Sequence, residues 1–502
     1  MTAPGCIAIR TAYAPAFPRA EAATGNRLDT THRLNSGTDK VNAAQRCQCS
    51  KMTHSYLGKY ICFMFIYSAL ASNPSSGCHS IKEHVIAEHL ATKTPYRFVM
   101  NSNDKPINIP GCEPQRIWLL VRHGTRYPGR QMIFKMTTQL SELRDIIVIG
   151  YRGKKEYGPD HICAKDIGRL KAWNLNVQES QEKHLAHEGE DEMIELAERF
   201  QKRFPKLFPG HFDNNTYKFQ YTATQRTGES ARYFTIGLFG RSGSLHVWFP
   251  EPLAKDPVLR FYKLCDRWRT QVDKNPATVL QKRKFERGPE MLAALKRITT
   301  RLGLNGTIGV ADAEVMYLTC TFETAWEKRG VSPWCSVFSE EDLKVFEYSE
   351  DLKYYWVDGY GYELTYKQAC PALKDMMEHL QPSSDNESGQ HTTVVYFSHS
   401  GTMLKLLCHL GLYKDSGVLL HSNYDSMADQ RKWRVGKIDS FGSNLAFVLF
   451  QCGNEAKLMT LHQERPVVLP GCPQDLLCPV ALFRQLYSES LENCNFLEMC
   501  AL

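Results

Sequence analysis

The chain has 502 residues, 43% of them hydrophobic, and a formal net charge of +7 at pH 7; this composition is typical of a globular protein with two or three domains. The positive charge is uneven, because residues 1–71 hold 8 Lys and Arg against 3 Asp and Glu, and the rest of the chain holds 53 against 51. We therefore expect no nucleic-acid partner, and any attraction for an anion has to come from a local site.

Residues 52–71 have the pattern of a secretory signal that starts at Met52. Lys59 supplies positive charge, residues 60–71 are apolar, and Ala69-Leu70-Ala71 is a small-x-small cleavage site. The apolar run is too short to span a bilayer, so we expect no transmembrane segment in the mature chain. Residues 1–51 show no apolar period, and we expect a leader that is either disordered or upstream of the true start. The alternative is a short buried helix in a cytosolic protein.

Thirteen cysteines follow the signal, and none forms a Cys-x-x-Cys pair of the metal-binding type. Disulfides are the usual role of such cysteines in an oxidising compartment. Two pairs are close enough to close small loops, although the sequence does not fix the connectivity: Cys320 with Cys335, and Cys472 with Cys478. The odd count leaves at least one thiol unpaired. Glycosylation sequons begin at Asn214, Asn305 and Asn386.

The last residues form neither an ER-retrieval tetrapeptide nor a hydrophobic tail for a lipid anchor. We therefore expect the secretory pathway, with either the extracellular space or the ER lumen as destination. The oligomeric state is not encoded in any pattern that we recognise.

A buried strand is predicted at residues 117–121, since five apolar residues run there without alternation. The strand leads directly into Arg122-His123-Gly124-Thr125-Arg126-Tyr127-Pro128. Ligand sites of open α/β sheets lie just beyond the carboxyl ends of strands. Two guanidinium groups there form a planar fork for an oxyanion, phosphate above all, and a neutral imidazole beside them can attack phosphorus.

A helix, two strand–helix units and two more strands follow in chain order. Apolar residues at helical spacing predict a helix over 193–204, and residues 219–224 read as a strand that leads to Arg226 at a helix start. Residues 393–397 read as a strand that leads to His399 and a helix ending at His409. Strands are also expected at 445–450 and 457–461.

Between these units the pattern becomes helical, with amphipathic helices expected over 279–302 and 311–329. The prediction is an α/β fold in which helices flank a sheet domain and a mostly α-helical domain is inserted into it. We place the sheet domain at 72–145, 186–240 and 390–502, and the helical domain at 146–185 and 241–389.

The motif at 122–128 resembles the signature of the histidine acid phosphatases. Its neighbours narrow the likeness to the multiple inositol polyphosphate phosphatase branch: Thr92-Lys93-Thr94-Pro95-Tyr96, Cys112-Glu113-Pro114, residues 192–200 and Arg203-Phe204-Pro205. The likeness covers roughly residues 78–470, and its seven-residue signature is specific. It implies a phosphoglycerate-mutase-like sheet domain with the active cleft beside the helical insertion.

The resemblance implies a phosphomonoester hydrolase that needs no metal and no cofactor. His123 is implied as the nucleophile that forms a phosphohistidine, and His399 as a second catalytic histidine. Arg122, Arg126 and Arg226 are implied as phosphate ligands; Lys93 and Thr125 are weaker candidates for substrate contacts, and a solvated lysine is a competing interpretation of Lys93. The expected partner is a small anionic phosphorylated substrate. The resemblance implies inositol hexakisphosphate and lower inositol phosphates, and it also allows 2,3-bisphosphoglycerate.

One departure from the family concerns the proton donor to the leaving alkoxide. The family carries an acid shortly after its second histidine, but the sequence here is His399-Ser400-Gly401-Thr402. Losing a general acid typically costs about 10²–10⁴-fold in rate. Another acid such as Glu464 or Asp425, a substrate phosphate or a water then has to supply the proton, or the protein is catalytically weak.

Two alternatives are open. The first is a general secreted acid phosphatase that acts on other esters. The second, which the missing acid after His399 motivates, is a binder of phosphorylated ligands with an inactive site. The motifs of serine hydrolases and zinc hydrolases are absent, since neither Gly-x-Ser-x-Gly nor His-Glu-x-x-His occurs.

Overall fold

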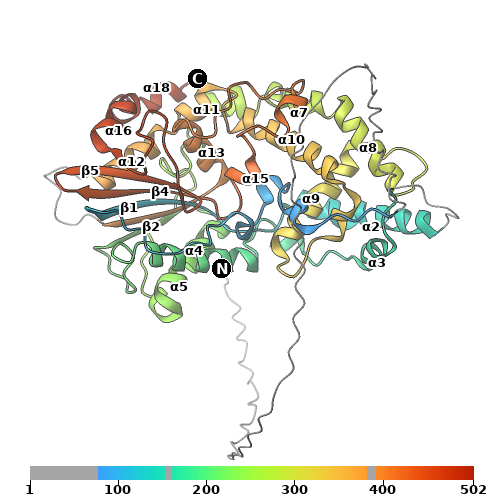
Figure 1. Ribbon diagram of the computed structural model, residues 1–502, viewed down its shortest axis with the longest axis horizontal. Coiled ribbons are helices and arrows are strands. Elements are labelled where there is room, and N and C mark those ends of the chain that lie inside the picture. Colours follow the sequence, from blue (N-terminus) through green and yellow to red (C-terminus); the bar gives the residue numbers. More distant parts are fainter. Residues whose placement is uncertain (1–76, 153–159, 382–390) are drawn as a thin grey trace, which may run out of the picture. The chain divides into compact units, whose positions relative to one another are not determined.

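The computed structural model describes residues 77–152, 160–381 and 391–502 and contains a mixed sheet, seen at the left of Figure 1. The strand order is β2-β3-β1-β4-β5-β6, with β7 paired to β5. β1 and β2 each pair with β3 in parallel, whereas β4 is antiparallel to both of its neighbours, β1 and β5. The strands are β1 (Cys112–Arg122), β2 (Tyr217–Tyr221), β3 (Thr393–Ser398), β4 (Asn444–Cys452), β5 (Glu455–His462), β6 (Arg465–Pro466) and β7 (Cys478–Pro479).

The apolar run in β1 is buried on both sides, as its lack of alternation predicts. Trp118 and Leu120 pack into one core of the sheet, whereas Ile117, Leu119 and Val121 pack into the core on the opposite face. All five side chains are at most 1% exposed. A central strand covered on both faces holds its last residue in a fixed position, and that residue is followed by the motif.

Helices cover both faces of this sheet (Figure 1). One face carries α4 (His187–Arg203) and α5 (Gln225–Ser244). The other carries α6 (Asp266–Trp268), α11 (Glu363–Lys367), α12 (Cys370–Leu380), α13 (Ser400–His409), α16 (Val480–Leu486), α17 (Ser488–Glu492) and α18 (Phe496–Cys500). The α/β class is therefore confirmed.

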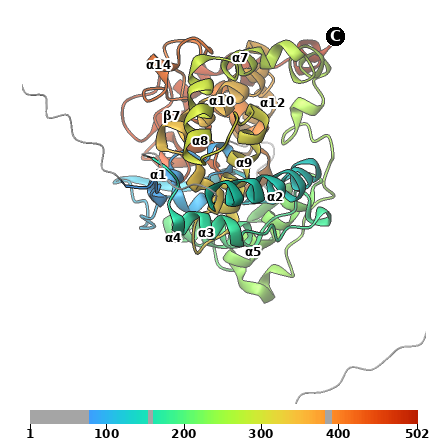
Figure 2. The same cartoon turned by 90° about the vertical axis from the view of Figure 1, so that its right-hand side faces the viewer.

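A second group of helices has its own apolar core beside the sheet, and Figure 2 looks onto several of its members. The group contains α1 (Glu83–Ala87), α2 (Arg130–Arg152), α3 (Ala164–Ala172), α7 (Leu280–Phe285), α8 (Pro289–Arg301), α9 (Val310–Trp326), α10 (Glu340–Val357), α14 (Tyr424–Met427) and α15 (Val435–Ile438). Short turns complete the fold: η1 (Ala91–Lys93), η2 (Tyr96–Phe98), η3 (Glu179–Gln181), η4 (Phe261–Lys263), η5 (Arg269–Asp273), η6 (Pro276–Val279) and η7 (Pro333–Val337).

The helix expected over 279–302 is wrong in one respect, because the structure divides it into α7 and α8. Gly288 and Pro289 lie at the break, and proline is well accommodated at the first position of a helix but not inside one. The core packing also crosses the expected domain borders, since α2 continues past residue 145 and α12 packs beside β1 on the sheet. Residues 72–502 form one compact unit. The division into two domains stays a prediction.

Six disulfides link the described residues, and Cys408 is a free, buried thiol. The pairs are Cys78–Cys163, Cys112–Cys452, Cys265–Cys500, Cys320–Cys335, Cys370–Cys494 and Cys472–Cys478. Cys112–Cys452 joins the start of β1 to the end of β4, the strand that pairs with β1. Of the sequons, Asn214 and Asn305 are exposed, whereas Asn386 and the predicted leader and signal lie outside the described residues. No described helix is long and apolar enough to cross a bilayer.

The loop after β1 touches the start of α4 through two glycines. A Cβ atom on Gly189 would lie 2.7 Å from the backbone nitrogen of Thr125, and one on Gly124 would lie 2.6 Å from the carbonyl oxygen of Gly189. Real side chains do not reach such distances, so only glycine permits this approach. The contact places the first turn of α4 directly against the residue that follows His123.

We predict that Gly189→Ala lowers the free energy of unfolding by about 1–3 kcal/mol, because the added methyl group forces the two backbones apart. Gly168→Ala in α3 is the matched control, since nothing lies within 4 Å of its Cβ position. Alanine there should stabilise the helix by about 0.5–1 kcal/mol. Urea unfolding of both variants measures the difference, and equal effects would contradict the close contact.

Candidate active site

His123 is fixed by the sheet on both sides of its backbone. Its amide donates to the carbonyl of Ser398 at 3.0 Å, and its carbonyl accepts from the amide of Gly442 at 3.2 Å. Ser398 is the last residue of β3, and Gly442 lies just before β4. The imidazole is 3% exposed. The ring therefore stands at the carboxyl end of β1, where the sequence predicts the site.

The tautomer of His123 follows from the hydrogen bond that its ring makes. Nδ1 lies 2.9 Å from the carbonyl oxygen of Gly124, which can only accept, so Nδ1 carries the proton. Nε2 of the neutral ring then keeps its lone pair. Burial and the charges of Arg226, Arg122 and Arg126 hold the pKa of His123 well below its usual range. The ring therefore favours its neutral form, with a lone pair on Nε2, at pH values below its usual pKa.

Arg122 is held behind this ring by backbone carbonyls. One terminal nitrogen donates to the carbonyl of Thr92 at 3.0 Å and the other to the carbonyl of Asp439. The carboxylate of Asp439 lies 3.4 Å from the guanidinium, which stacks 4.8 Å from the centre of the Phe441 ring. These contacts fix the plane of the guanidinium and leave its buried Nε without a partner.

Three more arginines lie near the imidazoles of His123 and His399. Arg126 lies in the loop after β1, Arg226 in the first turn of α5, and Arg260 directly before η4. Each has a buried Nε without a hydrogen-bond partner. Burial and the neighbouring guanidiniums lower the pKa of Arg126 to about 9 and that of Arg226 to about 10. Gathered cations with free donors are costly unless an anion joins them, so this arrangement is suited to an oxyanion.

His399, the N-cap of α13, is the second histidine of the site. Its ring centre lies 5.6 Å from that of His123. Nδ1 accepts from Arg226 at 3.3 Å, so Nε2 carries the proton and donates to the hydroxyl of Thr222 at 2.9 Å. Burial and the charges of Arg226 and Arg260 keep the pKa of His399 well below its usual range. The sequence-predicted residues Arg122, His123, Arg126, Arg226 and His399 therefore share one site.

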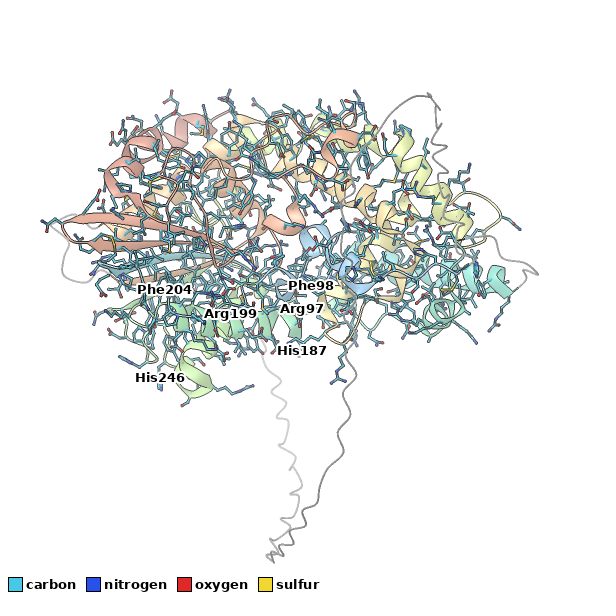
Figure 3. All side chains as sticks on the ribbon, viewed as in Figure 1. Arg97, Phe98, His187, Arg199, Phe204 and His246 are labelled. Carbon is cyan, nitrogen blue, oxygen red and sulfur yellow. A yellow bond between two sulfur atoms is a disulfide. The ribbon has the colours of Figure 1, made fainter. Side chains whose placement is uncertain are left out.

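Thr125, a candidate substrate contact, is fully buried. Its amide and hydroxyl donate to the carboxyl of Glu192 at 2.7 and 2.9 Å. Burial and the neighbouring Glu188 raise the pKa of Glu192 to about 7. Glu188, in the first turn of α4, pairs with Arg97, which Figure 3 labels. Thr125 thus holds the loop of the motif onto α4.

Lys93 lies beside the arginines rather than on open surface. It is 8% exposed, its amino group is 3.3 Å from the carboxylate of Glu350, and it stands 5.8 Å from the centre of the Phe322 ring. The guanidinium of Arg126 is 5.7 Å from that same ring. Lys93 is therefore a second cationic group next to the arginine cluster.

The two acids proposed from sequence as donors lie elsewhere. Glu464 is fully buried and accepts from the hydroxyl of Tyr96 and from Arg199 of α4, which Figure 3 labels. It also pairs with Arg203, so it anchors the end of β5 to α4. Asp425 is exposed on the short helix α14. Neither contacts a residue of the site.

Sequence reasoning missed Arg260 and Asp439. Arg260 follows no strand, and Asp439 stands six residues before the apolar run at 445–450, so neither belongs to a recognisable strand-end motif. The one available signal for Asp439 is its place before a strand that pairs antiparallel to β1 and therefore begins where β1 ends. Among the described residues, no group of three His, Cys, Asp or Glu side chains is arranged to hold a metal ion.

Comparisons with known proteins agree with this geometry. Residues 115–465 match the model of the histidine phosphatase superfamily (branch 2). The "Multiple inositol polyphosphate phosphatase 1" of Drosophila melanogaster is 35% identical over 76% of this chain and 81% of the relative. The protein of the same name from Homo sapiens is 30% identical over 83% of this chain and 89% of the relative.

Solved structures share the fold at low sequence identity. The phytase from D. castellii superposes with a TM-score of 0.65 at 17% identity, over 86% of this chain and 91% of that one. The multiple inositol polyphosphate phosphatase of Bifidobacterium longum, in complex with phosphate, gives 0.61 at 15% identity over 81% and 98%. This chain belongs to the histidine phosphatase superfamily (branch 2), among the multiple inositol polyphosphate phosphatases.

Proposed function

We propose that this chain is a phosphatase that hydrolyses inositol polyphosphates, inositol hexakisphosphate included, through a phosphohistidine on His123. The observation that carries the proposal is the pair of neutral imidazoles, His123 and His399, beside four guanidiniums that each have a buried Nε without a partner. A phosphoryl group supplies the negative charge and the acceptor oxygens that these donors lack. The names of the relatives at 30–35% identity support inositol polyphosphates as the substrate class.

The chemistry follows from the positions of the donors. Nε2 of His123 attacks phosphorus, the bond to the ester oxygen breaks, and the phosphoryl group moves to the ring. The arginines bind the equatorial oxygens, on which negative charge is spread during transfer. Water then attacks the phosphohistidine and releases phosphate. Lys93 is placed to contact a second phosphate of the same substrate, since it lies next to Arg126 across Phe322.

The compartment is part of this proposal. Disulfides persist in oxidising compartments, and six link the described residues. We propose that the protein enters the secretory pathway, with its final address open between the extracellular space and the ER lumen.

A catalytically weak binder of phosphorylated ligands is the second candidate. It is favoured by one observation, the lack of a carboxylate in Ser400-Gly401-Thr402 directly after His399. Phosphate release and ligand binding separate the two candidates, because a binder retains affinity without turnover.

We predict that His123→Ala abolishes phosphate release from inositol hexakisphosphate and the ³²P label that rapid quenching traps on the wild type. The reason is that no other imidazole of the site has a free lone pair, since Nδ1 and Nε2 of His399 are both bonded. His246→Ala is the control, because this histidine lies in an exposed turn after α5 (Figure 3). Equal turnover in the two variants would rule out the nucleophile.

We predict that the acid limb of kcat/KM for the wild type lies well below pH 6.5, since the pKa of His123 is held low and only the neutral ring attacks. Arg226→Gln removes one cation that disfavours the imidazolium, so the pKa of His123 rises and the acid limb moves to higher pH. The same change should lower kcat by about 10²–10³-fold, the usual effect of losing one donor to a developing charge.

Arg232→Gln, also on α5, controls for this experiment. Arg232 is half-exposed and pairs with Glu229 of its own helix. A pH profile of Arg226→Gln that overlays those of the wild type and Arg232→Gln would contradict the electrostatic role of Arg226.

A further inference from the structure

Departure of an inositol alkoxide needs a proton, because an alkoxide is a poor leaving group in water. Gly401, two residues after His399, brings no carboxyl group to the site. Asp439 is near, but it is fully buried, pairs with Arg122 and accepts from the hydroxyl of Ser400. It is placed to position Arg122 rather than to reach a substrate.

A different carboxylate fills the space beside Gly401. A Cβ atom built on Gly401 would lie 3.3 Å from Oδ1 of Asp358, 3.5 Å from Cζ of Tyr262 and 3.7 Å from Nζ of Lys405. Asp358 is the C-cap of α10, about forty residues earlier in the chain. Its carboxylate therefore stands where the side chain of residue 401 would begin, but it comes from another element.

Tyr262 connects Asp358 to the arginines. Its Cζ and Oδ1 of Asp358 both lie within 3.5 Å of the Cβ position of Gly401. Burial raises the pKa of Tyr262, Arg260 lowers it, and Asp358 raises it, so Tyr262 is close to both charged groups; Arg260 in turn lowers the pKa of His399. The Asp358 side chain is 15% exposed, so solvent and a substrate can reach it, in contrast to that of Asp439 at 0%.

Lys405 of α13 holds this carboxylate in place. Its amino group is fully buried, donates to Oδ1 of Asp358, and lies 4.2 Å from the centre of the Trp268 ring and 4.8 Å from that of Tyr262. A buried lysine between two aromatic rings has little freedom to move. The pair therefore fixes Asp358 relative to the start of α13, which also carries His399.

We propose that Asp358 is the proton donor of the reaction, in place of an acid at position 401. The inference rests on the proposed phosphatase activity. As Nε2 of His123 bonds to phosphorus, Asp358 gives a proton to the ester oxygen and takes one from the paired ammonium group of Lys405, and the alcohol leaves. The water that attacks phosphorus then gives a proton to Asp358, which returns one to Lys405; the bond from phosphorus to His123 breaks, and inorganic phosphate leaves.

The test compares two leaving groups in single turnovers of the whole chain. Asp358→Asn keeps the size of the side chain but has no acidic proton. It should slow phosphorylation of His123 by inositol hexakisphosphate about 10²–10⁴-fold. Phosphorylation by p-nitrophenyl phosphate should be largely unchanged, because p-nitrophenolate leaves without a proton. Loss of folding or of phosphate binding would slow both substrates alike, so the ratio of the two rates identifies the donor.

A second variant tests the position of the acid. Gly401→Glu in the Asp358→Asn background places a carboxyl group in the same space, and it should restore the rate on inositol hexakisphosphate. Glu363→Gln on α11 is the matched control, since Glu363 is 73% exposed and pairs with Lys367; both rates should stay at wild-type values.

Each other outcome has a distinct meaning. Equal rate losses on both substrates, or none on either, overturn the donor role of Asp358 while the His123 chemistry stands. Failure of Gly401→Glu to restore the rate overturns the assigned position of the acid. A wild type that releases no phosphate from either substrate overturns the phosphatase proposal, and the donor falls with it.

Discussion

The mutual repulsion of four guanidiniums around the two neutral imidazoles, His123 and His399, is the constraint on which the site depends. Cations without an anion are unfavourable in a buried place, so the fold has to hold them there. Arg122 is held by the carbonyls of Thr92 and Asp439, and Arg226 reaches His399 from the first turn of a helix. Burial and the same positive charges hold the pKa of His123 well below its usual range, so the cluster that suits an anion also keeps this imidazole neutral.

The sheet is the part of the fold that holds these side chains together. β1 is buried on both faces, and its carboxyl end lies beside that of β3 and opposite the start of β4. His123 and His399 follow the ends of β1 and β3, which explains why two histidines 276 positions apart have ring centres 5.6 Å apart. The contact of Gly124 with Gly189 adds α4 to the same assembly. The helical group then closes the site from the other side, through Phe322 of α9 and Asp358 of α10.

Strand-end positions were predictable because a single local pattern encodes them. The apolar run before Arg122 and the one before His399 each specify a buried strand, and parallel strands bring their carboxyl ends to one edge. Arg260 and Asp358 carry no such pattern, since they follow a loop and end a helix, respectively. The single helix expected over 279–302 failed for the opposite reason, because a clear local signal at Gly288-Pro289 was outweighed by a periodicity that continues on both sides of it.

The sequence by itself determined the α/β class, the place of His123 and two arginines just beyond a buried strand, and the absence of an acid after His399, since each depends on neighbours within a few residues. Only the tertiary structure decided that Arg260 joins the cluster, which cysteines pair, and that the carboxylate of Asp358 stands beside Gly401. These are contacts between elements distant in the chain. Packing of side chains on different elements fixes them, and no local pattern of residues records which elements will meet.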